Sequence, residues 1–128
     1  MTLTVKNLSI GHYGYSDGIR NFIDGADSAG GISIKGSLVN NREKLITYAT
    51  LYLKPCDKSG DSVGCSVRRK SKQGIDVEGP FHPGVPVEFF GESVWYNYSI
   101  CSCVIIGADV EYEDGSTEHI AGDFIVFE

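Results

Sequence analysis

The four cysteines of this 128-residue chain have the widest range of possible chemistry. Cys56, Cys65, Cys101 and Cys103 could form two disulfides, bind one metal ion or stay reduced. Cys101-Ser102-Cys103 lacks the C-x-x-C spacing of a zinc knuckle, and alternate residues of a strand point to one face. Cys65 alternates with small or polar residues, as a buried apolar residue does. The pattern favours four free thiols, while a disulfide and a metal site remain alternatives.

The other residues that catalyse reactions lack the spacing that catalysis needs. His12, His82 and His119 lie far apart, and no pair has the spacing of metal ligands. The chain has no G-x-S-x-G motif, and no predicted helix supplies an N-terminus that would lower a cysteine pKa. We therefore predict a protein that is not an enzyme, with no catalytic residue, no cofactor and no metal.

Two glycine-rich segments fail as ligand loops. Residues 25–31 contain no Lys-Ser or Lys-Thr pair and precede a strand, whereas a phosphate-binding loop opens a helix. Asp24 and Asp27 lack the regular alternation of oxygen ligands in a calcium loop.

Aromatic side chains are the better candidates for binding. Large rigid rings provide contact area at a small cost in entropy. We expect Tyr13, Tyr15, Tyr96 and Tyr98 to be contact residues, with a protein or a glycan as the alternatives. Trp95 is interpreted as a core residue, although a glycan site would use it.

Charged segments give two further candidates. Asp109, Glu111 and Glu113 alternate along one predicted strand and form an acidic stripe. The only dense basic run is 68–72, with Arg68, Arg69 and Lys70 as candidate contacts. Both segments are typical of solvated surface, with docking to a partner as the alternative.

Charge is unevenly distributed along the chain. Residues 1–72 carry all 11 Lys and Arg with 6 acidic residues, whereas residues 73–128 carry 11 acidic residues and no Lys or Arg. The net charge of -6 argues against nucleic-acid binding, which needs several cationic contacts to phosphates. Opposite charges on two surfaces would let copies of the chain attract one another. We therefore predict a homo-oligomer whose association weakens at high salt.

Strand patterns position these candidates. In residues 104–113 the even positions are apolar and the later odd ones acidic, so we predict that the even positions are buried. Ile32, Ile34 and Leu38 share one face, and residues 45–53 read as a central strand covered on both faces. Reversals are expected at 40–43, 57–61 and 113–116, with a crossing loop at 79–84 because Pro80 and Pro83 lack an amide donor.

The first 30 residues differ from the rest. A strand over 2–10 is followed by glycine- and tyrosine-rich residues around a short 19–23 segment, which predicts a long exposed loop region. We divide the single domain into 1–30, the N-terminal strand and excursion, and 31–128, the sandwich core. No apolar run reaches the roughly 20 residues of a membrane span, and no signal peptide is recognised, so a cytoplasmic location without membrane insertion is expected.

Several turn and core motifs are familiar. They are Ile32-x-Ile34-x-Gly36 with Asn40, residues 48–53, Cys56-Asp57 with Gly60-Asp61, Gly79-Pro80, residues 94–97 and Tyr112-x-Asp114-Gly115-Ser116. Their order resembles the bacterial immunoglobulin-like β-sandwich domains of unknown function related to the FxLYD type, over about two-thirds of the chain. The resemblance implies a non-catalytic module that is often an accessory part of a surface or envelope protein.

Together these patterns predict an all-β, two-layer antiparallel immunoglobulin-like sandwich of about seven or eight strands. The leading hypothesis for function is a protein-interaction module, such as a small bacterial or phage accessory or inhibitor protein that acts through loops and strand edges. The alternative is a module that binds a glycan or cell-wall polymer through Tyr13, Tyr15, Trp95 and Tyr96.

Overall fold

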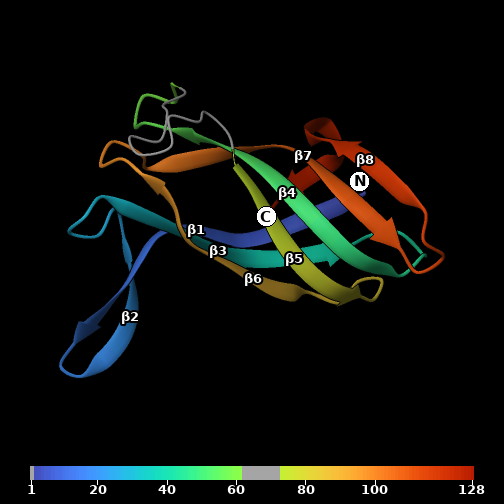
Figure 1. The fold of residues 1–128 in the computed structure, drawn as a ribbon, viewed down its shortest axis with the longest axis horizontal. Coiled ribbons are helices and arrows are strands. Elements are labelled where there is room, and N and C mark those ends of the chain that lie inside the picture. The colour runs from blue at the N-terminus through green and yellow to red at the C-terminus, as the bar shows by residue number, and fades with distance from the viewer. Residues whose placement is uncertain (1, 62–72) are drawn as a thin grey trace.

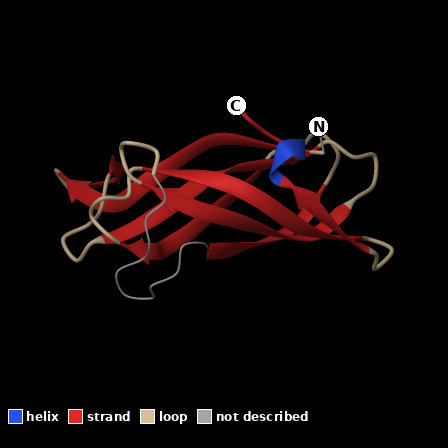
Figure 2. Ribbon diagram, turned by 90° about the horizontal axis from the view of Figure 1, so that it is seen from above, coloured by secondary structure: helices blue, strands red, loops and turns tan. Residues whose placement is uncertain are grey.

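The chain folds into two packed layers of β-strands, as Figures 1 and 2 show. This computed structural model describes residues 2–61 and 73–128. Cys65 and the basic residues Arg68, Arg69 and Lys70 therefore lie outside the described residues.

Sheet A contains the two ends of the chain and the N-terminal region. Its strand order is β2-β1-β3-β6, with β9 parallel to the first residues of β1 and all other pairs antiparallel. The strands are β1 (Leu3–Ser16), β2 (Ile19–Asp24), β3 (Gly31–Asn40), β6 (Val87–Tyr96) and β9 (Ile125–Phe127).

Sheet B has the order β5-β4-β7-β8 and is antiparallel throughout. Its strands are β4 (Ile46–Cys56), β5 (Gln73–Phe81), β7 (Ser102–Tyr112) and β8 (Thr117–Ala121). A single 3-10 turn, η1 (Gly122–Phe124), leads from β8 into β9. The predicted all-β, two-layer sandwich is confirmed, with nine strands in the described part of the chain.

The core lies between the inner faces of the two sheets. Ile32, Ile34 and Leu38 of β3 are buried together, as their alternation predicted. Trp95 of β6 is 1% exposed and packs in this same cluster. Trp95 is thus a core residue, and its burial removes it from any glycan-binding surface.

The strand β4 is central but has only one covered face. Ala49, Leu51 and Leu53 are buried, whereas the intervening Tyr48 and Tyr52 are half-exposed on the outer face of sheet B. The expectation of two covered faces was therefore wrong. Tyr and Thr are enriched in strands even on a solvated face, so the unbroken run of strand-favouring residues in 45–53 does not distinguish one covered face from two.

The strand β7 alternates as predicted only in its second half. From Ala108 to Tyr112 the even residues are buried, but Val104 and Ile106 are exposed and Ile105 is buried. The pairing with β4 shifts by one residue between Tyr52 and Leu53, where the register is irregular. This bulge reverses which parity faces the core, because side chains alternate from face to face along a strand.

Two of the connections between the sheets differ from the expected turns. Asn40 ends β3 in sheet A, and β4 begins in sheet B, so 40–43 is a crossing rather than a reversal within one sheet. The buried Asn40 side chain donates hydrogen bonds to the carbonyl oxygens of Lys44 (2.8 Å) and Phe81 (3.0 Å). The second crossing was expected at 79–84, but β5 continues to Phe81 and the crossing begins at His82. Pro80 is tolerated within β5 because β5 is an edge strand.

The predicted N-terminal loop region is a β-hairpin. β1 continues to Ser16 and pairs with β2 through a two-residue Asp17-Gly18 turn, in which both residues have positive φ (54° and 77°). These dihedral signs are those of a type I′ turn, whose twist matches that of the strands. Residues 11–24, called the arm below, extend beyond the sandwich at the lower left of Figure 1. The residues expected to form a loop packed on the domain thus form a paired hairpin that projects from it.

Candidate functional site

The outer face of sheet A carries the most distinctive cluster of exposed side chains. Tyr13 of β1 lies opposite Phe22 of β2, and Lys35 of β3 lies opposite Phe90 of β6. Tyr13 contacts Phe22 edge-on at 5.1 Å between ring centroids and contacts Phe90 at 5.2 Å. We call Tyr13, Phe22 and Phe90 the aromatic cluster.

A bend in β1 brings the arm to this face. The pairing of β1 with β3 shifts between Lys6 and Ser9, and Asn7 there has a φ of 55°. Before the bulge β1 pairs with β9, and after it β1 pairs with β2. The bulge therefore separates the part of β1 that pairs with β9 from the part that leads into the arm.

Two cations lie beside rings of the aromatic cluster. The Arg20 guanidinium lies 3.9 Å from the centroid of the Tyr13 ring, and the Lys35 ammonium lies 4.6 Å from that of Phe22. In the described part of the chain, ion pairs join Arg42 to Glu118, Lys44 to Asp114 and His119 to Asp109, and none includes Arg20 or Lys35. Both cations are therefore available to a carboxylate from outside.

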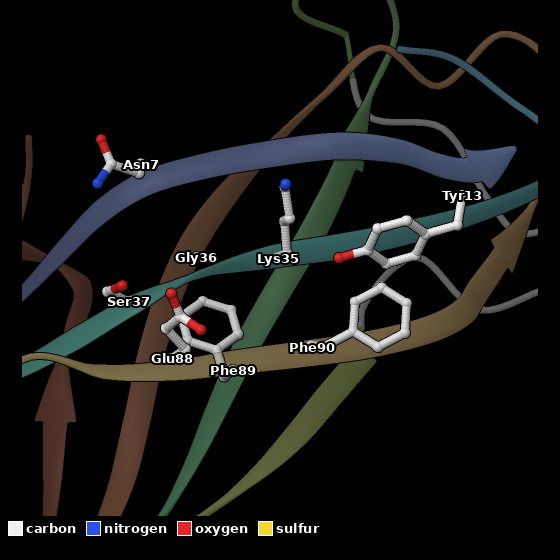
Figure 3. A pocket seen from close by; sticks show the side chains of 8 residues that line it. All are labelled: Asn7, Tyr13, Lys35, Gly36, Ser37, Glu88, Phe89 and Phe90. Carbon is white, nitrogen blue, oxygen red and sulfur yellow. The ribbon is translucent and has the colours of Figure 1, made fainter. Parts of the chain in front are cut away.

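The cluster borders a shallow hollow of about 490 Å³. Figure 3 shows the Tyr13 and Phe90 rings facing each other at one end, the Lys35 side chain between strands, and Glu88 at the other end. Asn7, Gly36, Ser37 and Phe89 complete its lining. The hollow thus combines exposed rings, one cation and several hydrogen-bonding groups.

The arm exposes apolar side chains on both of its faces. Tyr15 is 75% exposed beside Tyr13, and on the opposite face Ile19 and Ile23 are 63% and 43% exposed. A two-stranded ribbon that projects into water is at best marginally stable by itself. The arm therefore leaves apolar area exposed on both of its faces.

The outer face of sheet B has a different chemistry. Asp109 of β7 accepts a hydrogen bond from the Tyr52 hydroxyl (2.6 Å), and its other oxygen contacts His119 Nδ1 (2.7 Å). These partners lower the pKa of Asp109, the Tyr52 hydrogen bond most and His119 next, and the same hydrogen bond raises the pKa of Tyr52. Asp109 is therefore an anchored charge, and Tyr52 stays protonated as a donor.

The predicted acidic stripe lies on this face. Asp109 and Glu111 are exposed on β7, and Glu113 follows the end of the strand. Across β4, Asp76 and Glu78 of β5 occupy the equivalent positions. The sequence did not reveal Tyr52 and His119 as partners of Asp109, because their proximity depends on the register of β4 and β8.

The other two candidate tyrosines lie apart from the aromatic cluster. Tyr98 is 68% exposed, and its hydroxyl donates a hydrogen bond to the Ser28 carbonyl oxygen while its ring covers Gly30. Tyr96 is half-buried and packs against the core. The structure thus groups Tyr13 and Tyr15 on the arm and leaves Tyr96 and Tyr98 at the far end of β6.

The three described cysteines are free thiols. Cys56 is buried at the end of β4, and Cys103 is partly buried on the adjacent β7. Burial, and secondarily the neighbouring Cys56, raises the pKa of the Cys103 thiol to about 12. Among residues 2–61 and 73–128, no three His, Cys, Asp or Glu side chains gather as metal ligands.

The fold defines a two-layer β-sandwich, and solved structures share it. The chain is similar to IrmA from Escherichia coli, with a TM-score of 0.61, 14% identity, and coverage of 98% of this chain and 90% of that one. It is also similar to the structural genomics target SoR45, with a TM-score of 0.52, 11% identity, and coverage of 94% and 81%. At these identities the likeness shows the fold alone.

No protein-family model and no curated protein matches the chain. The resemblance to the FxLYD type therefore stays a prediction. No helix in the described part of the chain has the length and apolar character needed to cross a membrane.

Proposed function

We propose that this protein is a non-catalytic interaction module that binds another protein through the outer face of sheet A. The observation that carries the proposal is the aromatic cluster with its two available cations. Three contacting rings stay accessible at the surface, and Arg20 and Lys35 have no carboxylate partner in the described residues. Aromatic and Arg side chains are the residue types most enriched among those that contribute most to protein binding.

The surface indicates the chemistry of the partner. A carboxylate placed near Lys35 and Arg20 would gain charge-assisted hydrogen bonds, and an apolar group beside it would cover Tyr13 and Phe90. The arm adds contact area through Tyr15. We therefore expect a partner surface that combines acidic and apolar side chains. Binding without chemistry is also how an accessory or inhibitor protein acts.

A glycan is the second candidate, because rings and polar groups share the hollow beside Lys35. Sugars bind to open ring faces, however, and the Arg20 guanidinium already lies 3.9 Å from the Tyr13 centroid. Phe90 contacts the same ring at an interplanar angle of 56°. These contacts leave little free ring face on Tyr13 and favour a protein partner over a sugar.

The test is quantitative capture from an extract of the source organism. The immobilised protein is compared with Phe90→Ala and Lys35→Glu, which change the proposed face, and with Phe124→Ala and Lys58→Glu, which change an exposed Phe and Lys elsewhere. We expect one protein to be retained in stoichiometric amount by the wild type and both controls. Its retention should fall by about tenfold or more in the two face variants.

Equal capture by all five proteins would contradict the proposal. Saturable binding to an immobilised sugar, weakened by Phe90→Ala but not by Phe124→Ala, would replace the protein partner with the glycan.

A further inference from the structure

The strand β2 is an edge of sheet A whose outer side pairs with nothing in the described part of the chain. Ser16 and Ile19 flank the two-residue turn, and such flanking residues exchange hydrogen bonds with each other. Bonding then alternates along the hairpin, so Asn21 and Ile23 bond to β1. The backbone amides and carbonyls of Arg20, Phe22 and Asp24 therefore point away from β1, toward the free edge.

Edges of this kind are usually protected by charge, by proline or by a covering loop. The six residues of β2 include no proline, and five of its six side chains are exposed. Ile19 and Ile23 remain exposed on the side opposite the aromatic cluster. The strand is thus an accessible template for a second strand, with Arg20 and Asp24 as its only charged residues.

We infer that β2 pairs antiparallel with β2 of a second copy of this chain, across a two-fold axis through Phe22. A two-fold axis perpendicular to the sheet keeps each side chain on its own face, so residues of equal parity must lie opposite each other. With Phe22 opposite the partner subunit's Phe22, Arg20 lies opposite the partner subunit's Asp24, and Asp24 opposite the partner subunit's Arg20. Two opposite-charge pairs and one aromatic pair then occupy one face.

This register uses the backbone groups that the hairpin leaves free. Arg20, Phe22 and Asp24 are the residues whose amides and carbonyls point outward, and they are also the residues that this register pairs. Asp24 forms no ion pair in the described part of the chain, so its carboxylate is available to the partner subunit's Arg20. Charge and backbone complementarity thus select a second copy over an unrelated strand.

The pairing has a consequence for the proposed binding face. Sheet A of the two copies becomes continuous, and because Phe22 belongs to the aromatic cluster, the two clusters meet at the axis. A dimer would then present two binding faces on the same side, so a repetitive partner would be held by both. The inference goes beyond the proposed function and shares Arg20 and Phe22 with the proposed face. Dimerisation needs no other protein, however, so either proposal can fail without the other.

The test is the molar mass in solution of the full chain and of three charge variants, measured by light scattering across a concentration series. Arg20→Asp places like charges opposite each other, Asp24→Arg does the same with the other sign, and the double variant restores opposite charges. Lys58→Asp, in the exposed 57–61 turn, is the matched control for charge. A contact of one short strand is small, so we expect a dimer with a dissociation constant on the order of micromolar.

We expect the wild type, Lys58→Asp and the double variant to reach the dimer mass, and both single variants to remain monomers over the same range. Raising the salt concentration should weaken the wild-type dimer, because the two charge pairs are exposed and are screened. A wild type that stays monomeric overturns the inference. So does a dimer that persists in both single variants, or a double variant that fails to recover the dimer.

Discussion

Burial gives the thiols near the start of β7 different reactivities. Cys101 is exposed, and its amide donates a hydrogen bond to the Cys56 carbonyl oxygen at 3.0 Å. Two residues later the Cys103 thiol has a pKa of about 12, because burial penalises its thiolate. The thiolate is the nucleophile of cysteine, so exposure and pKa together decide which residue reacts.

Among the described cysteines, alkylation with iodoacetamide at pH 8 should therefore modify Cys101 first. At that pH a thiol of pKa 12 is ionised in only about one molecule in ten thousand, so Cys103 should stay unmodified while the protein is folded. Peptide mass spectrometry over time measures both rates. Cys103 reacting as fast as Cys101 in folded protein would show that the thiol is not buried as described, and denaturation should make the two rates similar.

Glycines in the arm set how closely its strands approach. A Cβ built on Gly11 would lie 2.0 Å from the Ile23 carbonyl oxygen, which belongs to the backbone of β2. A Cβ on Gly14 would meet only the end of the Ile23 side chain, at 2.7 Å, and that side chain can rotate. The two positions therefore differ in what a methyl group displaces.

Gly11→Ala should separate β2 from β1, whereas Gly14→Ala should leave the hairpin paired. Amide hydrogen exchange measures this directly, because the β1–β2 hydrogen bonds protect the amides of both strands. We expect faster exchange across the arm in Gly11→Ala and a nearly unchanged pattern in Gly14→Ala. Similar exchange in both variants would show that the close contact at Gly11 does not hold the strands in place.

Element by element, the sequence predicted the buried face of β3 better than that of β7. Alternation at Ile32, Ile34 and Leu38 identified a core face correctly, since burial on one side enforces a period of two. It failed at Ile105 and Ile106, where a bulge beside Gly107 adds one residue and reverses the parity.

The arm shows why part of the site was found and part was missed. Asp17-Gly18 between Tyr15 and Ile19 is the signal of a two-residue hairpin, and it was present in the sequence. Tyr13 and Tyr15 were predicted as contacts from their type. Phe22, Phe90 and Lys35 join Tyr13 only through the register of four strands, which no local pattern determines.

For the molecule as a whole, the two outer faces differ in their charged groups. The outer face of sheet A carries Arg20 and Lys35 from the basic first half of the chain, together with Asp24 and Glu88. The outer face of sheet B carries Asp76, Asp109 and Glu111 from the acidic second half. Sheet B thus offers like charge to an acidic partner, which favours binding on sheet A.

Site-specific photo-crosslinking measures whether a protein partner contacts the outer face of sheet A. A benzoylphenylalanine replaces Phe90 on that face or, in the control, the exposed Phe124 of η1, and cells of the source organism expressing each variant are irradiated. We expect a discrete covalent adduct with another protein from position 90 and none from position 124. Adducts from position 124 alone, or from neither position, would contradict the proposed contact.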